Sequence, residues 1–163
     1  MSNFIDNITF IQRTKSIIEN YNGEFDVSLI INSCVGLLFM AKEKYHSTIS
    51  RAKSEKTLAK WGINISDIKF CGKYDHKRQQ VIIQDKRIST VCSHIRNSIA
   101  HCNFKTLQKG TQGDIKQLLL RDFYIPSNRN KEPIMTFEMV ISVEDFRKFI
   151  MSVADYILKK HKS

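Results

Sequence analysis

The sequence has few of the residues that interrupt regular structure or cross-link a chain. Its 163 residues include 2 Pro, 6 Gly and 4 Cys, and no two cysteines form a C-x-x-C pair. Regular elements are therefore expected over most of the chain. The hydrophobic fraction of 42% is ordinary for a globular protein and argues against disorder. We expect one domain, residues 1–163, that needs no disulfide or metal ion to fold.

Signals for secretion and membrane insertion are also missing. Met1 to Asp6 lack the basic region and apolar run with which a signal peptide begins. The longest apolar stretch, Val27 to Met40, is interrupted by polar residues and is shorter than the ~20 residues that span a bilayer. We therefore expect a cytoplasmic protein with reduced cysteines and no membrane partner.

The common catalytic and nucleotide-binding motifs are absent. The chain has no Gly-rich phosphate loop, no H-E-x-x-H and no G-x-S-x-G. A zinc site made of Cys92, His94 and Cys102 is conceivable, but its spacing matches no common template. These absences argue against P-loop and Rossmann nucleotide sites and against zinc-protease and serine-hydrolase chemistry.

Acidic residues are scarce. The chain has 16 Asp+Glu against 26 Lys+Arg, which gives a formal net charge of +10. Residues 42–87 alone carry a net charge of +7, from 12 Lys+Arg and 5 Asp+Glu. This balance favours a polyanionic partner, namely RNA, DNA or an anionic membrane surface, and the alternative is a solvated basic surface without a specific partner.

Apolar spacing predicts a largely helical chain. Helices are expected from residue 3 to about 20, from Asp26 through an apolar core segment to about Lys60, over residues 88–102, and over the last twenty or so residues. Trp61-Gly62 is expected to end the second of these regions, and Ser142 with Asp145 resembles a capping box for the last helix.

Strand patterns are fewer. Leu118 to Tyr124 and Met135 to Ile141, joined by a polar turn, predict a β-hairpin. Residues 62–84 are harder to assign, and Cys71 to Gln80 is interpreted as a basic loop. The expected fold is therefore mainly α, a four- or five-helix bundle with one β-hairpin inserted before the C-terminal helix.

The polar end of the helix at 88–102 holds the candidate site. On a helical wheel Asn97 and His101 face away from the apolar stripe on the same side, four residues apart, so that they can meet. Thr90 and Ser93 continue this polar face, and Arg96 lies on its flank.

These residue types suit one kind of chemistry. An imidazole can take or give a proton near neutral pH, and a guanidinium can bind and stabilise a phosphate. Arg, Asn and His without clustered carboxylates suit metal-independent cleavage of RNA, in which the 2′-OH is the nucleophile. The alternative is that Arg96, Asn97, His94 and His101 are ordinary surface residues at a helix end.

A family resemblance is carried by the same segment. Arg96-Asn97-Ser98-Ile99-Ala100-His101 resembles the R-x4–6-H motif of the HEPN superfamily (higher eukaryotes and prokaryotes nucleotide-binding domain), in which a polar residue often follows the Arg. The apolar run Leu29 to Leu38 is similar to the early core helix of such domains. The strand pair and last helix resemble its hairpin-bearing bacterial and plasmid-borne branch.

The resemblance implies an all-α homodimer in which two motifs face each other and form one cleft. Many active members are metal-independent endoribonucleases, including toxins of toxin–antitoxin pairs and antiphage defence effectors. Carried over by residue, Arg96 and His101 would be catalytic, Asn97 would be an accessory polar residue, and no cofactor would be needed. A cognate antitoxin or regulator is a further partner that the resemblance suggests.

The basic stretch Lys69 to Arg87 is then a candidate RNA-tracking surface, with a solvated loop as its alternative. Two other functions stay open. One is a HEPN fold without activity that serves as a nucleotide-binding or assembly module. The other is an unrelated helical nucleic-acid-binding regulator, although the helix at 88–102 carries few basic residues for a recognition helix.

Overall fold

The computed structural model describes residues 7–23, 27–38, 55–84, 86–108, 115–127 and 131–161. The expected helical segment over residues 39–54 lies outside this part. The elements are α1 (Asn7–Asn20), a helix at residues 27–38, α3 (Glu55–Lys60), the 3-10 turn η1 (Ile65–Asp67), β1 (Ile68–Asp75), β2 (Gln80–Ile83), α4 (Ile88–Ala100), β3 (Phe104–Gln108), β4 (Ile115–Tyr124), β5 (Ile134–Ser142) and α5 (Val143–His161).

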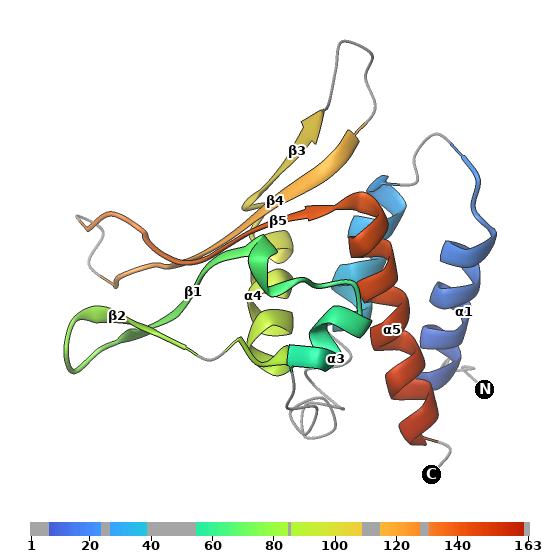
Figure 1. Ribbon diagram of the computed structural model, residues 1–163, viewed down its shortest axis with the longest axis horizontal. Coiled ribbons are helices and arrows are strands. Elements are labelled where there is room, and N and C mark those ends of the chain that lie inside the picture. The colour runs from blue at the N-terminus through green and yellow to red at the C-terminus, as the bar shows by residue number, and fades with distance from the viewer. Residues whose placement is uncertain are drawn as a thin grey trace, which may run out of the picture.

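The strands form one antiparallel sheet of five strands, in the order β2-β1-β5-β4-β3 (Figure 1). The protein is therefore an α+β fold, and the expectation of a mainly α bundle with a single hairpin is wrong. The expected hairpin exists as β4 and β5, at the centre of the sheet rather than as an insertion. It pairs on one side with β1 and on the other with β3.

The strands that were not predicted have weak sequence patterns. Cys71 to Gln80, interpreted as a basic loop, contains most of β1 and its turn into β2. A register shift between Ile68 and Phe70 breaks the alternation of inward and outward side chains in β1. Strand β3 has only five residues and follows α4 directly. Strand β1 pairs with β5, β3 pairs with β4, and β2 pairs with β1. A local pattern does not reveal these stabilising partners.

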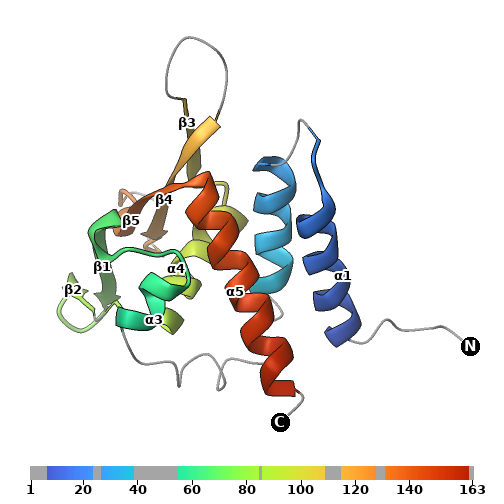
Figure 2. The same ribbon diagram turned by 45° about the vertical axis from the view of Figure 1, so that its right-hand side comes forward.

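Helices cover one face of the sheet (Figure 1). Helix α4 lies beneath the central strands, and α5, the helix at 27–38 and α1 stand beside one another in a row (Figure 2). Inward side chains of β4 and β5 meet the apolar stripes of α4 and α5 in one buried core, as Leu118, Phe137, Ile95 and Phe149 show. None of the described helices is both long enough and apolar enough to cross a membrane.

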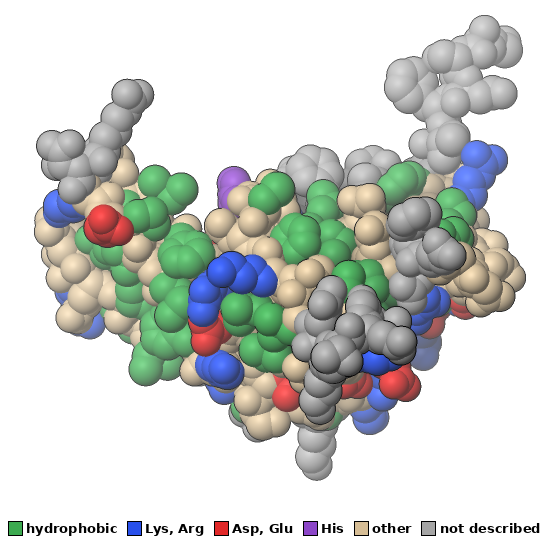
Figure 3. Space-filling model, turned by 90° about the horizontal axis from the view of Figure 1, so that it is seen from above, with side chains coloured by type: hydrophobic (Ala, Val, Ile, Leu, Met, Phe, Trp, Pro, Cys, Tyr) green, Lys and Arg blue, Asp and Glu red, His purple; other side chains and the backbone are tan. Residues whose placement is uncertain are grey.

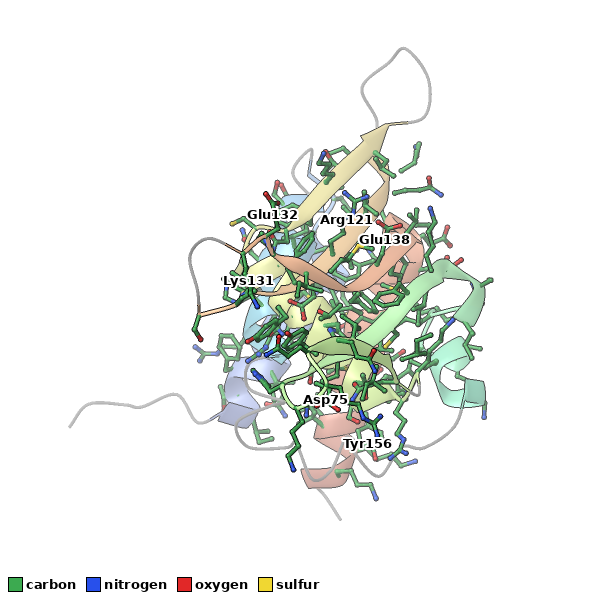
Figure 4. The ribbon with its side chains drawn as sticks, turned by 90° about the vertical axis from the view of Figure 1, so that its left-hand side faces the viewer. Asp75, Arg121, Lys131, Glu132, Glu138 and Tyr156 are labelled. Atoms are coloured by element: carbon green, nitrogen blue, oxygen red, sulfur yellow. The ribbon has the colours of Figure 1, made fainter. Side chains whose placement is uncertain are left out.

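The opposite face of the sheet is only half-buried. Along β4, Leu119, Arg121 and Phe123 alternate with the buried side chains of the core face. Hydrophobic side chains gather where the molecule is seen from above (Figure 3). Arg121 Nε donates to Glu138 Oε2 across β4 and β5 at 2.7 Å, and the two side chains lie next to each other (Figure 4). This ion pair connects two central strands on the half-buried face.

Helices α3 and α4 each end in a C-terminal cap with the same hydrogen-bond pattern. After α3, Ile63 N–H donates to Leu58 O at 2.9 Å, and Gly62 has a φ of 87°. After α4, Asn103 N–H donates to Ser98 O at 2.7 Å, and Cys102 has a φ of 55°. Both are Schellman motifs, whose left-handed residue is usually glycine. Gly62 fits this rule, as the expected stop at Trp61-Gly62 implied, whereas Cys102 holds a conformation that is strained for an L residue.

Replacing Cys102 with glycine is therefore expected to stabilise the protein by about 1 kcal/mol. The thiol is exposed, so its loss removes no core packing. Thermal or urea unfolding of Cys102→Gly and of Cys102→Ser, which keeps the strain, measures the difference. Equal stabilities of the two variants would contradict the expectation.

The predicted cap of the last helix is present. Ser142 Oγ accepts the Asp145 N–H at 3.0 Å and donates to Asp145 Oδ2 at 2.7 Å. This cap begins α5 directly after β5, and the short connection directs α5 back across the face of the sheet.

Candidate functional site

The site begins with a buried carboxylate in β4. Inward positions of β4 alternate as Leu118, Leu120 and Asp122, and Asp122 is only 5% exposed. Strand pairing places Asp122 opposite Phe137 of β5. A carboxylate in such a position is stable only if it is hydrogen-bonded. Its partners come from α4, the helix that packs beneath β4.

Two side chains of α4 donate to the same oxygen of Asp122. Asn97 Nδ2 lies 2.9 Å from Asp122 Oδ2, and His94 Nδ1 lies 2.8 Å from it. Because the oxygen accepts from both, Nδ1 is the protonated nitrogen of His94. The other carboxylate oxygen accepts the Phe123 N–H at 2.9 Å. The His94 ring also stacks on Phe137, with centroids 4.9 Å apart and planes at 5°.

Arg96 extends this network. Its Nη2 donates to Asn97 Oδ1, so that Arg96, Asn97, Asp122 and His94 form one continuous chain of hydrogen bonds. Arg96 Nε is buried and has no hydrogen-bond partner in the described part of the chain. The other terminal N–H groups of the guanidinium are left for another acceptor. The structure therefore brings two of the three sequence-predicted site residues, Arg96 and Asn97, into direct contact.

His101 is placed differently. It is the C-cap residue of α4, with φ −99° and ψ 12°, and its backbone N–H donates to Asn97 O at 2.9 Å. Its side chain is exposed, and no described residue hydrogen-bonds to it. The predicted meeting of the Asn97 and His101 side chains therefore does not occur within one chain. The Schellman cap fixes the position of the His101 backbone at the surface.

A cavity of about 430 Å³ opens beside this network. It is lined by residues of α4, by the facing ends of β1, β4 and β5, and by the segments that follow β1 and β2. Asn97, His94 and Asp122 contribute to its wall, together with Thr90 and Ser93 from the predicted polar face of α4. This face is covered by the sheet instead of lying open to solvent.

The basic stretch Lys69 to Arg87 forms β1, β2 and the connections that follow them. At the hairpin tip, Asp75 Oδ1 accepts the N–H groups of Lys77 and Arg78 at 2.8 and 3.2 Å, which builds the turn. The side chains of Lys69, Lys73, Lys77 and Arg78 are exposed. The Lys86 ammonium instead binds within the chain, because its Nζ donates to the carbonyls of Ile65 and Ile68.

The conceivable zinc site is not assembled. Cys92 lies in the core, where burial raises the pKa of its thiol to about 12, whereas Cys102 is exposed beyond the end of α4. His94 is engaged with Asp122. Within the described residues, no three His, Cys, Asp or Glu side chains cluster as metal ligands.

Sequence reasoning missed Asp122, the pairing of His94 with Asp122, and the strand residues that line the cavity. One signal was present, because Asp122 occupies the inward register of an otherwise apolar strand, and a carboxylate there requires a partner. Nothing local to the sequence indicates that this partner is α4.

Comparison with known proteins identifies the family of this chain. The family model described as HEPN pEK499 p136 matches residues 1–163, and the chain belongs to this family of the HEPN superfamily. No curated protein and no solved structure was found to match the chain. Family membership removes the alternative of an unrelated helical regulator.

Proposed function

We propose that this protein is a metal-independent endoribonuclease of the HEPN type, which acts as a homodimer and serves as a toxin or antiphage effector. The proposal rests on one observation. In a chain of the HEPN family, the Arg96 guanidinium is anchored through Asn97 to buried Asp122, five residues before an exposed His101.

In this proposal, dimerisation brings together an Arg96 and a His101 side chain that lie apart within one chain. Within a protomer the Arg96 side chain turns toward Asn97 and Asp122, whereas His101 lies at the surface beyond the helix end. A two-fold axis near the end of α4 brings the Arg96 of one protomer toward the His101 of the other. The composite cleft then holds two arginines and two histidines around one phosphate.

The reaction follows from these groups. Arg96 binds the non-bridging oxygens of the scissile phosphate and stabilises their charge. His101 of one protomer removes the 2′-OH proton, and O2′ forms a bond to phosphorus while the bond to O5′ breaks. The partner's His101 donates a proton to the leaving O5′. The products are a 2′,3′-cyclic phosphate, or the 3′-phosphate after its hydrolysis, and a 5′-OH end.

The experiment is direct. Purified protein is incubated with single-stranded and structured RNA in EDTA, and the new ends are analysed for cyclic phosphate and 5′-OH. Sedimentation at micromolar concentration measures the oligomeric state. Cleavage that disappears on chelation contradicts the metal-independent mechanism, and a monomer contradicts the composite cleft.

The exposed lysines of the β1–β2 hairpin lead to a prediction of how RNA binding responds to salt. Replacing Lys73 and Lys77 with glutamine is expected to weaken RNA binding and to lower the salt slope by about 1.4, because each lost phosphate contact contributes roughly 0.7 on single strands. Fluorescence anisotropy over a series of salt concentrations measures the slope. The matched control is Lys148→Gln with Lys160→Gln, two exposed lysines of α5. An equal effect of the two pairs would show that only net charge matters.

A further inference from the structure

We propose that the cavity between α4 and the ends of β1 and β4 is a base-binding subsite, which holds one unpaired nucleobase of the RNA beside Asn97. This inference rests on the proposed endoribonuclease function, because Asn97 belongs both to the cavity wall and to the hydrogen-bonded chain that holds Arg96. A base bound here lies next to the phosphate that Arg96 is proposed to bind.

The size and lining of the cavity suit a nucleobase. Its volume of about 430 Å³ lies within the range of roughly 300–1,000 Å³ that is typical of small-molecule sites. One part of the wall is aromatic and another part is polar. Unpaired bases in RNA are recognised through these two features, by stacking on an aromatic ring and by hydrogen bonds to the base edge.

The aromatic part is held in place by its own contacts. Tyr74 of β1 and Tyr124 of β4 stack with ring centroids 4.0 Å apart and planes at 6°. His76 packs edge-on against both rings, at 5.4 and 5.1 Å. The Tyr124 hydroxyl lies 3.4 Å from His76 Nδ1. Because three rings fix one another, a base that stacks on them orders few additional side chains, which favours binding.

The polar part comes mainly from α4. Thr90, Ser93 and Asn97 lie three or four residues apart on the helix, so that their side chains share one face. His94 also lines the cavity, and its Nδ1 is occupied by Asp122, whereas Nε2 has no partner within the described residues. These hydroxyl, amide and imidazole groups supply donors and acceptors for a base edge.

Positive charge lies next to the cavity. A second hollow of about 360 Å³ shares Lys73, Tyr74, His76 and Gln84 with the first and adds Asp75, Lys77 and Ile82. The Asp75 carboxylate is engaged in the hairpin turn, where its Oδ1 accepts the N–H groups of Lys77 and Arg78. Phosphates on either side of a bound base therefore pass close to two lysines. This combination of stacked rings, polar wall and adjoining lysines favours a nucleotide of a single strand over an apolar ligand.

The test measures binding without cleavage. Full-length His101→Ala protein is titrated in EDTA with a short fluorescent single-stranded RNA, and then with RNAs in which each position in turn is abasic. We expect one abasic position to weaken binding roughly 5- to 100-fold. Tyr124→Leu is expected to weaken the binding of intact RNA by the same factor. With the RNA that is abasic at that position, Tyr124→Leu is expected to cause no further loss of affinity. Tyr124→Phe keeps the ring and retains the affinity.

The controls separate stacking from misfolding. Tyr156→Leu, on α5, removes a tyrosine that packs against Trp61 at 5.3 Å, and it is expected to leave base-dependent binding intact. If Tyr124→Leu does not fold, Thr90→Phe, which fills the cavity from α4, takes its place. Absence of RNA binding, affinity unaffected by every abasic position, or equal weakening of intact and abasic RNA by Tyr124→Leu would overturn the subsite.

The test of the base-binding subsite can fail or succeed independently of the test of RNA cleavage. Base-dependent binding by a wild-type protein that does not cut RNA would refute the endoribonuclease and leave the subsite standing. Cleavage by a protein whose binding ignores the base would refute only the subsite.

Discussion

Replacing His101 with alanine is expected to lower RNA cleavage in EDTA by roughly 100-fold or more and to leave the unfolding temperature unchanged. A positioned acid or base typically contributes about 10²- to 10⁴-fold to a rate. The His101 side chain is exposed, and no described residue hydrogen-bonds to it, so its removal leaves no buried group without a partner. Single-turnover cleavage and thermal unfolding of the same preparation measure both quantities.

Two further variants make this result specific. Lys105→Ala is the control. It changes an exposed residue of β3, four positions after His101, and is expected to cut RNA at the wild-type rate. Arg96→Lys keeps a positive charge but loses the planar fork that binds phosphate, and is expected to be nearly as inactive as Arg96→Ala. Wild-type cleavage by His101→Ala would overturn the assigned acid–base role.

The helical part of the protein was predictable because its signals are local. The apolar stripe of α4 and the cap of α5 each lie within a few turns of one helix, and both appear in the structure. The R-x4–6-H motif is local in the same way. For this reason Arg96, Asn97 and His101 could be proposed as site residues before any packing was known.

The sheet was only half predictable. Strands β4 and β5 are long and alternate well, whereas β1 contains a register shift and β2 has exposed Ile82 and Ile83 at the edge of the sheet. These outer strands are held by pairing with partners that are distant in sequence. The basic character of Cys71 to Gln80 indicated a loop, but Lys73 lies on β1, between β2 and β5, and Lys77 and Arg78 lie in the turn from β1 into β2.

The environment of the site was hidden for the same reason. On an isolated helical wheel the polar face of α4 points to solvent, but in the fold the sheet covers it and turns Thr90, Ser93 and Asn97 into cavity wall. His94, considered a surface residue in one interpretation, is 9% exposed and bonded to Asp122. Only the pairing of α4 with β4 brings these groups together.

Asp122→Ala is expected to have the largest combined effect on stability and activity. The change leaves His94 Nδ1 and Asn97 Nδ2, two half- or fully buried donors, without their acceptor. Loss of such a buried network costs about 3 kcal/mol of unfolding free energy. Once Asn97 is released, Arg96 loses its anchor, and a displacement of about 1 Å lowers the rate roughly 100-fold.

Asp122 is a positioning residue in this scheme, and a matched variant distinguishes positioning from stability. Ser142 caps α5 outside the cavity, and its hydroxyl accepts the Asp145 N–H at 3.0 Å. Ser142→Ala is expected to cost about 1 kcal/mol and to leave kcat unchanged. Asp122→Ala, assayed well below its unfolding midpoint, is expected to lose kcat with little change in KM. If kcat instead follows stability alone across both variants, Asp122 supports the fold and does not position Arg96.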